Sequence, residues 1–92
     1  MSAGEQAVRC LVKGRVQGVW YRASAEKQAQ RLNLSGWARN LPDGEVEVVV
    51  AGPPDVVAEF CGWLWEGPTG ASVTGVTVAE WTEEVNPGFD TT

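Results

Sequence analysis

The 92-residue chain contains no histidine, only two cysteines, and no lysine or arginine after residue 39. Without histidine, the chain lacks the most common general base of enzymes and every nucleophile that depends on one. The two isolated cysteines do not form a C-x-x-C motif, and together with the missing histidines they leave no usual set of transition-metal ligands. We therefore expect no metal ion and no cofactor, and any chemistry must proceed without a histidine.

The charge is divided unevenly along the chain. Residues 1–39 carry seven basic and two acidic side chains, whereas residues 40–92 carry ten acidic side chains and no basic one. The overall net charge of -5 opposes broad nucleic-acid binding, so we expect no nucleic-acid partner. The basic first part of the chain could still hold one small anion.

No segment resembles a membrane span or a secretory signal peptide. We therefore expect a cytoplasmic protein without membrane association, and a monomer by default. The length fits a single domain, which we place at residues 7–92 after a flexible tail, residues 1–6. In a reducing cytosol, Cys10 and Cys61 are expected to be buried thiols, and a disulfide between them would require Cys10 to face the helices.

Alternating and helical patterns of apolar residues predict five strands and two helices. The expected strands cover residues 7–13, 35–40, 45–52, 72–81 and a short piece of 88–92. The expected helices cover residues 22–32 and 53–67. The order β-α-β-β-α-β predicts an α+β fold, the ferredoxin-like α/β sandwich, in which an antiparallel sheet of four to five strands carries two helices on one face.

Residues 14–22, with the sequence GRVQGVWYR, form the first candidate site. They leave a strand and enter a helix, and they contain two glycines and two arginines but no carboxylate. Glycines allow successive amides to point into one concavity, and a helix N-terminus adds partial positive charge. Arg22 can offer a planar fork of donors to two oxygens of a phosphoryl group. The pattern indicates an anion site, and the alternative is a tight turn with solvated arginines.

Asn40 is the second candidate, because it lies where a predicted strand ends before the turn LPDG. A neutral amide in this place could hold a water molecule or a substrate atom. The alternative is a turn asparagine that bonds its own backbone, which is the more common use.

The two stretches together resemble the acylphosphatase family. Its first signature, apolar-x-G-x-V-Q-G-V-x-aromatic-R, is matched by Val12, Gly14, Val16, Gln17, Gly18, Val19, Tyr21 and Arg22. Its second signature is matched by Gly36, Trp37, Ala38, Arg39, Asn40, Gly44, Val46 and Gly52. The departures are small: Tyr21 stands where phenylalanine is more common, and Leu41 replaces a hydroxyl residue found in some members.

The resemblance implies a hydrolase that splits the carboxyl–phosphate bond of acyl phosphates without a metal, releasing a carboxylate and inorganic phosphate. It assigns phosphoryl binding to Arg22 and orientation of the attacking water to Asn40. The residues expected to complete the substrate site, mainly through backbone amides, are Arg15, Val16, Gln17, Gly18, Val19 and Trp20. Structural roles remain open for three of them: Arg15 could be solvated, Gln17 could bond the loop backbone, and Trp20 could shield the site, contact an acyl group or only pack.

Two other functions remain alternatives. A non-catalytic phosphate- or RNA-binding module could share the fold, although the aromatic motif of RNA-binding sheets is missing. A substrate domain of a larger hydrogenase-maturation protein that handles carbamoyl phosphate would also fit. The chain is too short to hold the other parts of such a protein, so we expect a free-standing enzyme.

Overall fold

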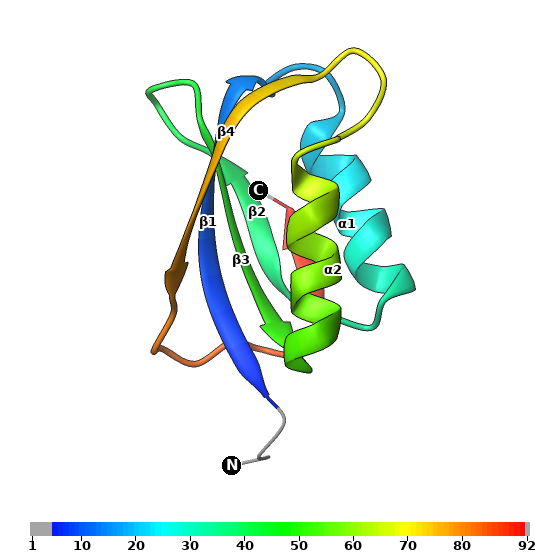
Figure 1. Cartoon of the computed structure of the whole chain (residues 1–92), viewed down its shortest axis with the longest axis vertical. Helices are drawn as coiled ribbons and strands as arrows, with labels where there is room; N and C mark the ends of the chain where they lie inside the picture. The colour runs from blue at the N-terminus through cyan, green and yellow to red at the C-terminus, as the bar shows by residue number, and fades with distance from the viewer. Residues whose placement is uncertain (1–4, 92) are drawn as a thin grey trace.

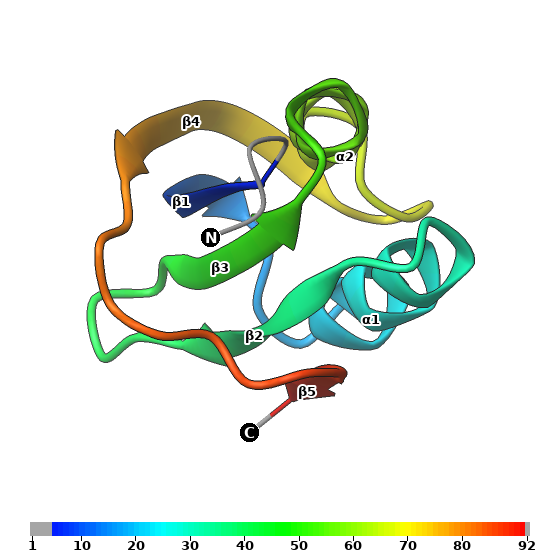
Figure 2. The same cartoon turned by 90° about the horizontal axis from the view of Figure 1, so that it is seen from below.

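The computed structural model describes residues 5–91, which form five strands and two helices. In chain order, the elements are β1 (Gln6–Arg15), α1 (Tyr21–Arg31), β2 (Ser35–Asn40), β3 (Val46–Gly52), α2 (Pro54–Leu64), β4 (Ser72–Glu80) and β5 (Phe89–Thr91). The strands form one sheet in the order β4-β1-β3-β2-β5. Both helices cover the same face of this sheet (Figure 1, Figure 2). The predicted ferredoxin-like α+β sandwich is confirmed.

The first strand is longer at both ends than its sequence pattern predicts. It begins at Gln6, inside the stretch expected to be a tail, and residues 1–4 of that stretch lie outside the described part of the chain. It continues to Arg15 because Gly14 and Arg15 still pair with β4 beyond a register shift. The alternation of buried residues stops at Lys13, so the sequence pattern could not show this extension.

The fifth strand corrects the expectation of a wholly antiparallel sheet. β5 pairs with β2 in parallel, with Gly36 opposite Phe89 and Ala38 opposite Thr91. This strand has only three residues, but the side chain of Phe89 is buried and its ring lies 6.1 Å from the ring of Phe60 on α2. Burial of one such side chain stabilises a fold by about 1.5–3 kcal/mol, which explains how so short a strand holds its place.

The core lies between the sheet and the two helices. Residues on one side of β1 and β3 alternate inward, and the small residues Ala25 and Ala29 allow α1 to lie close to the sheet. The buried core residues on the strands are Val8, Cys10, Val12, Ala38, Val46, Val48, Val50 and Phe89. On α2 they are Val57, Phe60 and Leu64.

The two cysteines meet inside this core as free thiols. Cys10 faces the helices, and its Sγ atom lies 3.7 Å from Sγ of Cys61 on α2. Cys10 is buried as expected, whereas Cys61 is only half-buried. The contact with the Cys61 sulfur, together with burial, raises the pKa of Cys10, while the same contact lowers the pKa of Cys61.

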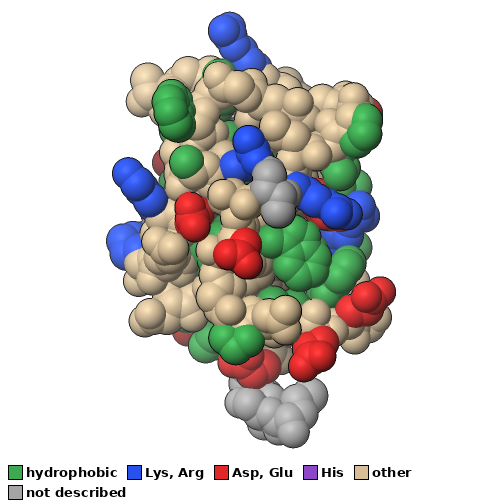
Figure 3. All heavy atoms as spheres, turned by 180° about the vertical axis from the view of Figure 1, so that it is seen from behind, with side chains coloured by type: hydrophobic (Ala, Val, Ile, Leu, Met, Phe, Trp, Pro, Cys, Tyr) green, Lys and Arg blue, Asp and Glu red, His purple; other side chains and the backbone are tan. Residues whose placement is uncertain are grey.

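Charge is also divided unevenly in space. On the face shown in Figure 3, Lys and Arg side chains lie in the upper half, while Asp and Glu side chains extend to the lower end. The upper end carries the loop between β1 and α1 (Figure 1). On this face, the basic side chains therefore lie nearer to the end of the molecule that holds this loop.

On the sheet face away from the helices, the buried carboxylate of Glu47 holds two arginines. Its Oε2 accepts a hydrogen bond of 2.5 Å from Nε of Arg9, and its Oε1 accepts one of 2.6 Å from Nε of Arg39. Nε1 of Trp37 lies 3.4 Å from the same Oε1. Burial alone would raise the pKa of Glu47, but the three donors outweigh it and hold this pKa below its ordinary value.

We predict that replacing Glu47 by glutamine lowers the free energy of unfolding at pH 7 by about 1.5–3 kcal/mol, the range for hydrogen bonds to charged groups. We expect a value at the low end of this range, because the side chains of Arg9 and Arg39 are 36% and 54% exposed and solvent weakens their ion pairs with Glu47. Since the pKa of Glu47 is lowered on folding, the wild-type advantage is complete above the ordinary pKa and shrinks as pH falls through the native one. Urea unfolding of the wild type and the variant at pH 7 measures this stability difference, and the same experiment at pH 3 measures how far it decreases.

The exposed Glu83 provides the control, because Glu83→Gln should change stability by less than about 0.5 kcal/mol at either pH. A Glu47→Gln difference that stays constant from pH 7 to pH 3 would contradict the lowered pKa.

Candidate active site

Near its end, β1 contains a glycine that no other residue could replace without a shift of the neighbouring strand. Gly14 has φ +125°, and a Cβ atom on it would lie 2.1 Å from the carbonyl oxygen of Ser72 on β4. Gly18, inside the loop, has φ +74° with open space around it. The side chain of Val16 is buried and that of Val19 is half-buried against the core. The loop is therefore anchored by its valines, while its backbone turns at Gly18.

Several backbone amides at this turn have no partner in the secondary structure. None of the main-chain hydrogen bonds in the described part of the chain has an amide of residues 16–20 as its donor. The first bond of α1 joins the amide of Ser24 to the carbonyl of Trp20 at 2.9 Å, so the amides of residues 21–23 precede it. The first turn of α1 contains no acidic residue and no side-chain cap. The positive end of the helix dipole is left for an anion.

Residues of this turn and of the start of α1 line a cavity of about 370 Å³. Its lining residues are Val16, Gly18, Trp20, Tyr21, Arg22, Ala23 and Thr91. Arg22 is half-buried, so its guanidinium belongs to a partly desolvated wall in which a charge-assisted hydrogen bond is stronger than in water. The cavity thus brings Arg22 together with residues of the loop and of the start of α1.

Asn40 reaches the same end of the molecule along a different strand. It pairs with Val46 of β3, which in turn pairs with Val12 of β1. Two strand spacings therefore separate Asn40 from Val12, or about 10 Å. Alternation along β2 places Asn40 on the same side as Gly36 and Ala38, which is the side covered by α1. The side chain of Asn40 is exposed, and Asn40 is not among the residues that line the cavity.

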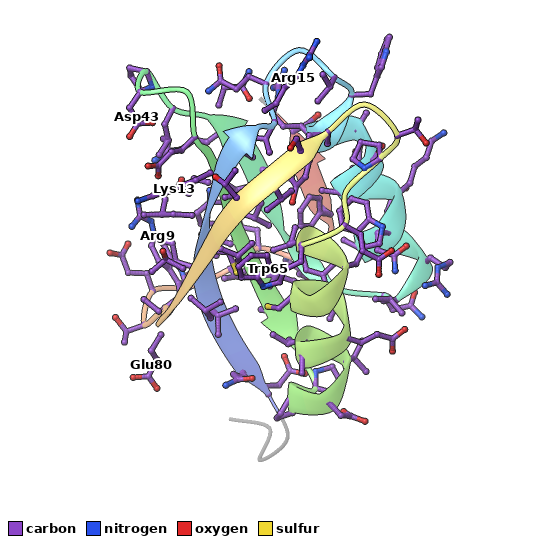
Figure 4. All side chains as sticks on the ribbon, turned by 45° about the horizontal axis from the view of Figure 1, so that its top comes forward. Arg9, Lys13, Arg15, Asp43, Trp65 and Glu80 are labelled. Atoms are coloured by element: carbon purple, nitrogen blue, oxygen red, sulfur yellow. The ribbon has the colours of Figure 1, made fainter. Side chains whose placement is uncertain are left out.

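Gln17 connects the loop to the hairpin that follows Asn40. Its Nε2 donates one hydrogen bond of 2.8 Å to the carbonyl of Leu41 and one of 2.9 Å to the carbonyl of Glu45. The amide of Leu41 also donates to the carbonyl of Glu45 at 2.8 Å. Arg15 at the end of β1 and Asp43 in the hairpin lie at the same end of the molecule, while Glu80 lies at the opposite end (Figure 4).

Tyr21 fixes the start of α1 from the other side. Its hydroxyl donates a hydrogen bond of 2.6 Å to the carbonyl of Leu64, at the end of α2. Its ring is buried, and the centroid of the ring lies 5.8 Å from that of Trp63. Burial raises the pKa of the Tyr21 hydroxyl. Tyr21 stands where phenylalanine is more common in the family, and its additional hydroxyl therefore has a hydrogen-bond partner in the fold.

Comparison with known proteins matches residues 8–91 to the acylphosphatase family. The chain belongs to the acylphosphatase family. An acylphosphatase from Azoarcus sp. (strain BH72) is 52% identical over 91% of this chain and 87% of its own length. The solved acylphosphatase from Coxiella burnetii is 38% identical, with a TM-score of 0.93 and complete coverage of both chains (100%). The one from Bacillus subtilis is 32% identical, with a TM-score of 0.89, covering 94% of this chain and 97% of that one.

Membership of the acylphosphatase family makes the chain a hydrolase and decides against the non-catalytic module. Within residues 5–91, no three histidine, cysteine, aspartate or glutamate side chains are grouped as metal ligands would be. No described helix is long and apolar enough to cross a membrane.

The structure places some of the predicted acylphosphatase site residues at the cavity and others away from it. Val16, Gly18, Trp20 and Arg22 line the cavity. Arg15 is exposed in the described structure, and the side chain of Gln17 is directed to the hairpin. The substrate contacts of all the predicted site residues, Arg22 and Asn40 included, remain predictions. Thr91 was missed: it reaches the cavity only because β5 pairs with β2, and no motif in the sequence indicates that pairing.

We predict that Gln17→Leu lowers the free energy of unfolding by about 1–3 kcal/mol, because leucine keeps the volume and removes both hydrogen bonds. The amides of Leu41 and Gly44, which close the hairpin, should exchange with solvent faster. Urea unfolding and amide hydrogen exchange measure the two effects. Gln30→Leu, on the exposed side of α1, is the matched control and should leave both unchanged. Unchanged hairpin exchange in Gln17→Leu would show that the link does not order the hairpin.

Proposed function

We propose that this enzyme hydrolyses acyl phosphates to a carboxylate and inorganic phosphate. The observation that supports the proposal is the cavity that Arg22 lines together with Val16 and Gly18 of the loop, at the sheet edge where β2 also ends. In this scheme, the amides and the start of α1 hold the phosphoryl oxygens, and Arg22 binds two of them through its planar guanidinium. Asn40 holds the attacking water on the other side of the phosphorus.

The chemistry suits a chain without histidine. The water oxygen forms a bond to phosphorus, the bond from phosphorus to the acyl oxygen breaks, and its electron pair leaves with the carboxylate. A carboxylic acid has a pKa of about 4, so its anion departs at neutral pH without a general acid. Neither an amide nor a guanidinium is a base at this pH, so one proton of the water passes to a phosphoryl oxygen of the substrate.

Stabilisation of charge then accounts for the catalysis. Phosphoryl transfer passes through a loose transition state with negative charge on the equatorial oxygens, so positioning and electrostatics dominate. Preorganised amides and one guanidinium stabilise this charge where Mg²⁺ does so in kinases and GTPases. We further propose that the enzyme needs no metal and acts as a cytoplasmic monomer without a nucleic-acid or membrane partner, as the sequence predicts.

Hydrolysis of benzoyl phosphate by the purified chain tests the activity, with and without EDTA. We expect turnover that EDTA does not change. Phenyl phosphate is the matched control and should not be hydrolysed, because its phenol leaving group has a pKa of about 10 and needs a general acid. No turnover of benzoyl phosphate would overturn the proposed activity. Loss of turnover in EDTA would overturn the metal-independent scheme alone.

Variants of Arg22 and Asn40 should separate binding from catalysis. Arg22→Ala and Arg22→Lys should lower kcat by about 100- to 1,000-fold, the effect of removing one such donor, and should weaken inhibition by inorganic phosphate. Asn40→Ala should lower kcat to a similar extent, while phosphate inhibits as in the wild type. Steady-state kinetics with phosphate as the inhibitor measure both parameters.

The controls are Arg31→Ala, in the last turn of α1, and Asn86→Ala, in an exposed loop. Both should keep wild-type kinetics, and circular dichroism should show that all variants are folded. Near-normal kcat in an Arg22 or Asn40 variant would exclude that residue from its proposed role.

A further inference from the structure

Trp20 is the most exposed of the large apolar side chains in the described structure. Its exposed fraction is 81%, compared with 53% for Trp65 and 50% for Val78. The aromatic contacts of the described residues join Tyr21, Trp37, Phe60, Trp63, Trp81 and Phe89, but not Trp20. An indole usually buries a large apolar area, and here that area faces solvent. Packing within the described chain therefore does not explain this residue.

The backbone of Trp20 makes its presence more unusual. It has φ 66° and ψ 19°, in the left-handed region that bulky residues disfavour. Glycine or asparagine would adopt this conformation more readily, and Gly18 nearby already does so with φ 74°. A bulky ring is thus held where its local conformation is unfavourable, and such outliers are concentrated at ligand sites.

The cavity beside Trp20 is larger than a phosphoryl group requires. A water molecule takes about 30 Å³ in the liquid, and a phosphoryl group has the size of roughly three of them. Most of the 370 Å³ therefore remains after the phosphoryl group is bound at Arg22. Among the lining residues, Val16, Trp20 and Ala23 offer apolar surface for the rest of a substrate.

We propose that Trp20 forms a subsite for the acyl group and favours flat, apolar acyl groups, above all aromatic ones. This inference rests on the proposed hydrolysis of acyl phosphates. Trp20 is two residues from Arg22, and both residues line one cavity. An acyl carbon is joined to the phosphorus through a single oxygen. A phosphoryl group held by Arg22 thus brings its acyl group within reach of the indole, which can stack on an aromatic ring.

The test compares benzoyl phosphate with acetyl phosphate, which has no ring to stack. Trp20→Ala should lower kcat/KM for benzoyl phosphate by about 2- to 12-fold, the effect of one aromatic pair. It should change kcat/KM for acetyl phosphate by less than about 2-fold, and inhibition by inorganic phosphate should stay unchanged. Trp20→Phe should keep most of the preference for benzoyl phosphate.

Two further variants guard against misinterpretation. Trp20→Gly keeps the left-handed conformation without strain, so it should show the same substrate-dependent loss even if alanine disturbs the loop. Trp65→Ala removes the second exposed tryptophan, which lies after α2, and should alter neither substrate's kinetics.

Equal losses for both substrates would overturn the subsite and assign Trp20 to loop structure. No loss for either substrate would overturn it as well. If the wild-type chain hydrolyses neither substrate, the proposed function fails and the subsite fails with it. If it hydrolyses acetyl phosphate while the variants show no difference between substrates, only the subsite fails.

Discussion

The position of β3 between β1 and β2 is the constraint on which the candidate site depends. β3 is antiparallel to both neighbours, so β1 and β2 run in the same direction and end at the same edge of the sheet. Asn40 and the β1–α1 loop come together for this reason, although they lie far apart in the sequence. The buried valines that fix the register of β3 therefore also fix the distance across the site.

Several basic side chains of residues 1–39 form ion pairs with glutamates outside the candidate site. Glu47 holds Arg9 and Arg39 on the outer sheet face, and Lys13 and Arg31 each lie 3.9 Å from a glutamate. Four of the seven basic side chains thus face a carboxylate within 4 Å. The site receives its positive character from Arg22 together with backbone amides, whose partial charges are fixed by the fold. This explains how a chain of net charge -5 can offer a site to an anion.

Local sequence patterns predicted every strand and helix, with β2 correct at both ends, because each element has its own periodicity or turn residues. The missing features all depend on contacts between distant segments. The extension of β1 depends on pairing with β4, and the place of Thr91 depends on the parallel pairing of β5. The two signature motifs predicted that Arg22 and Asn40 act together in one site. They could not show that Gln17 bonds carbonyls 24 and 28 residues away, because no local pattern encodes such a partner.

A site without a titrating base has to obtain its rate from geometry, and the loop is held accordingly from two sides. Gln17 joins it to the hairpin after Asn40, and Tyr21 joins the start of α1 to the end of α2. Both links use neutral donors and backbone carbonyls, so neither depends on a charge that salt could screen. A guanidinium and an asparagine placed by such links need little reorganisation when charge develops on the phosphoryl oxygens. Trp20 lies between these two links, and in the proposed subsite it contacts the acyl group while Arg22 holds the phosphoryl group.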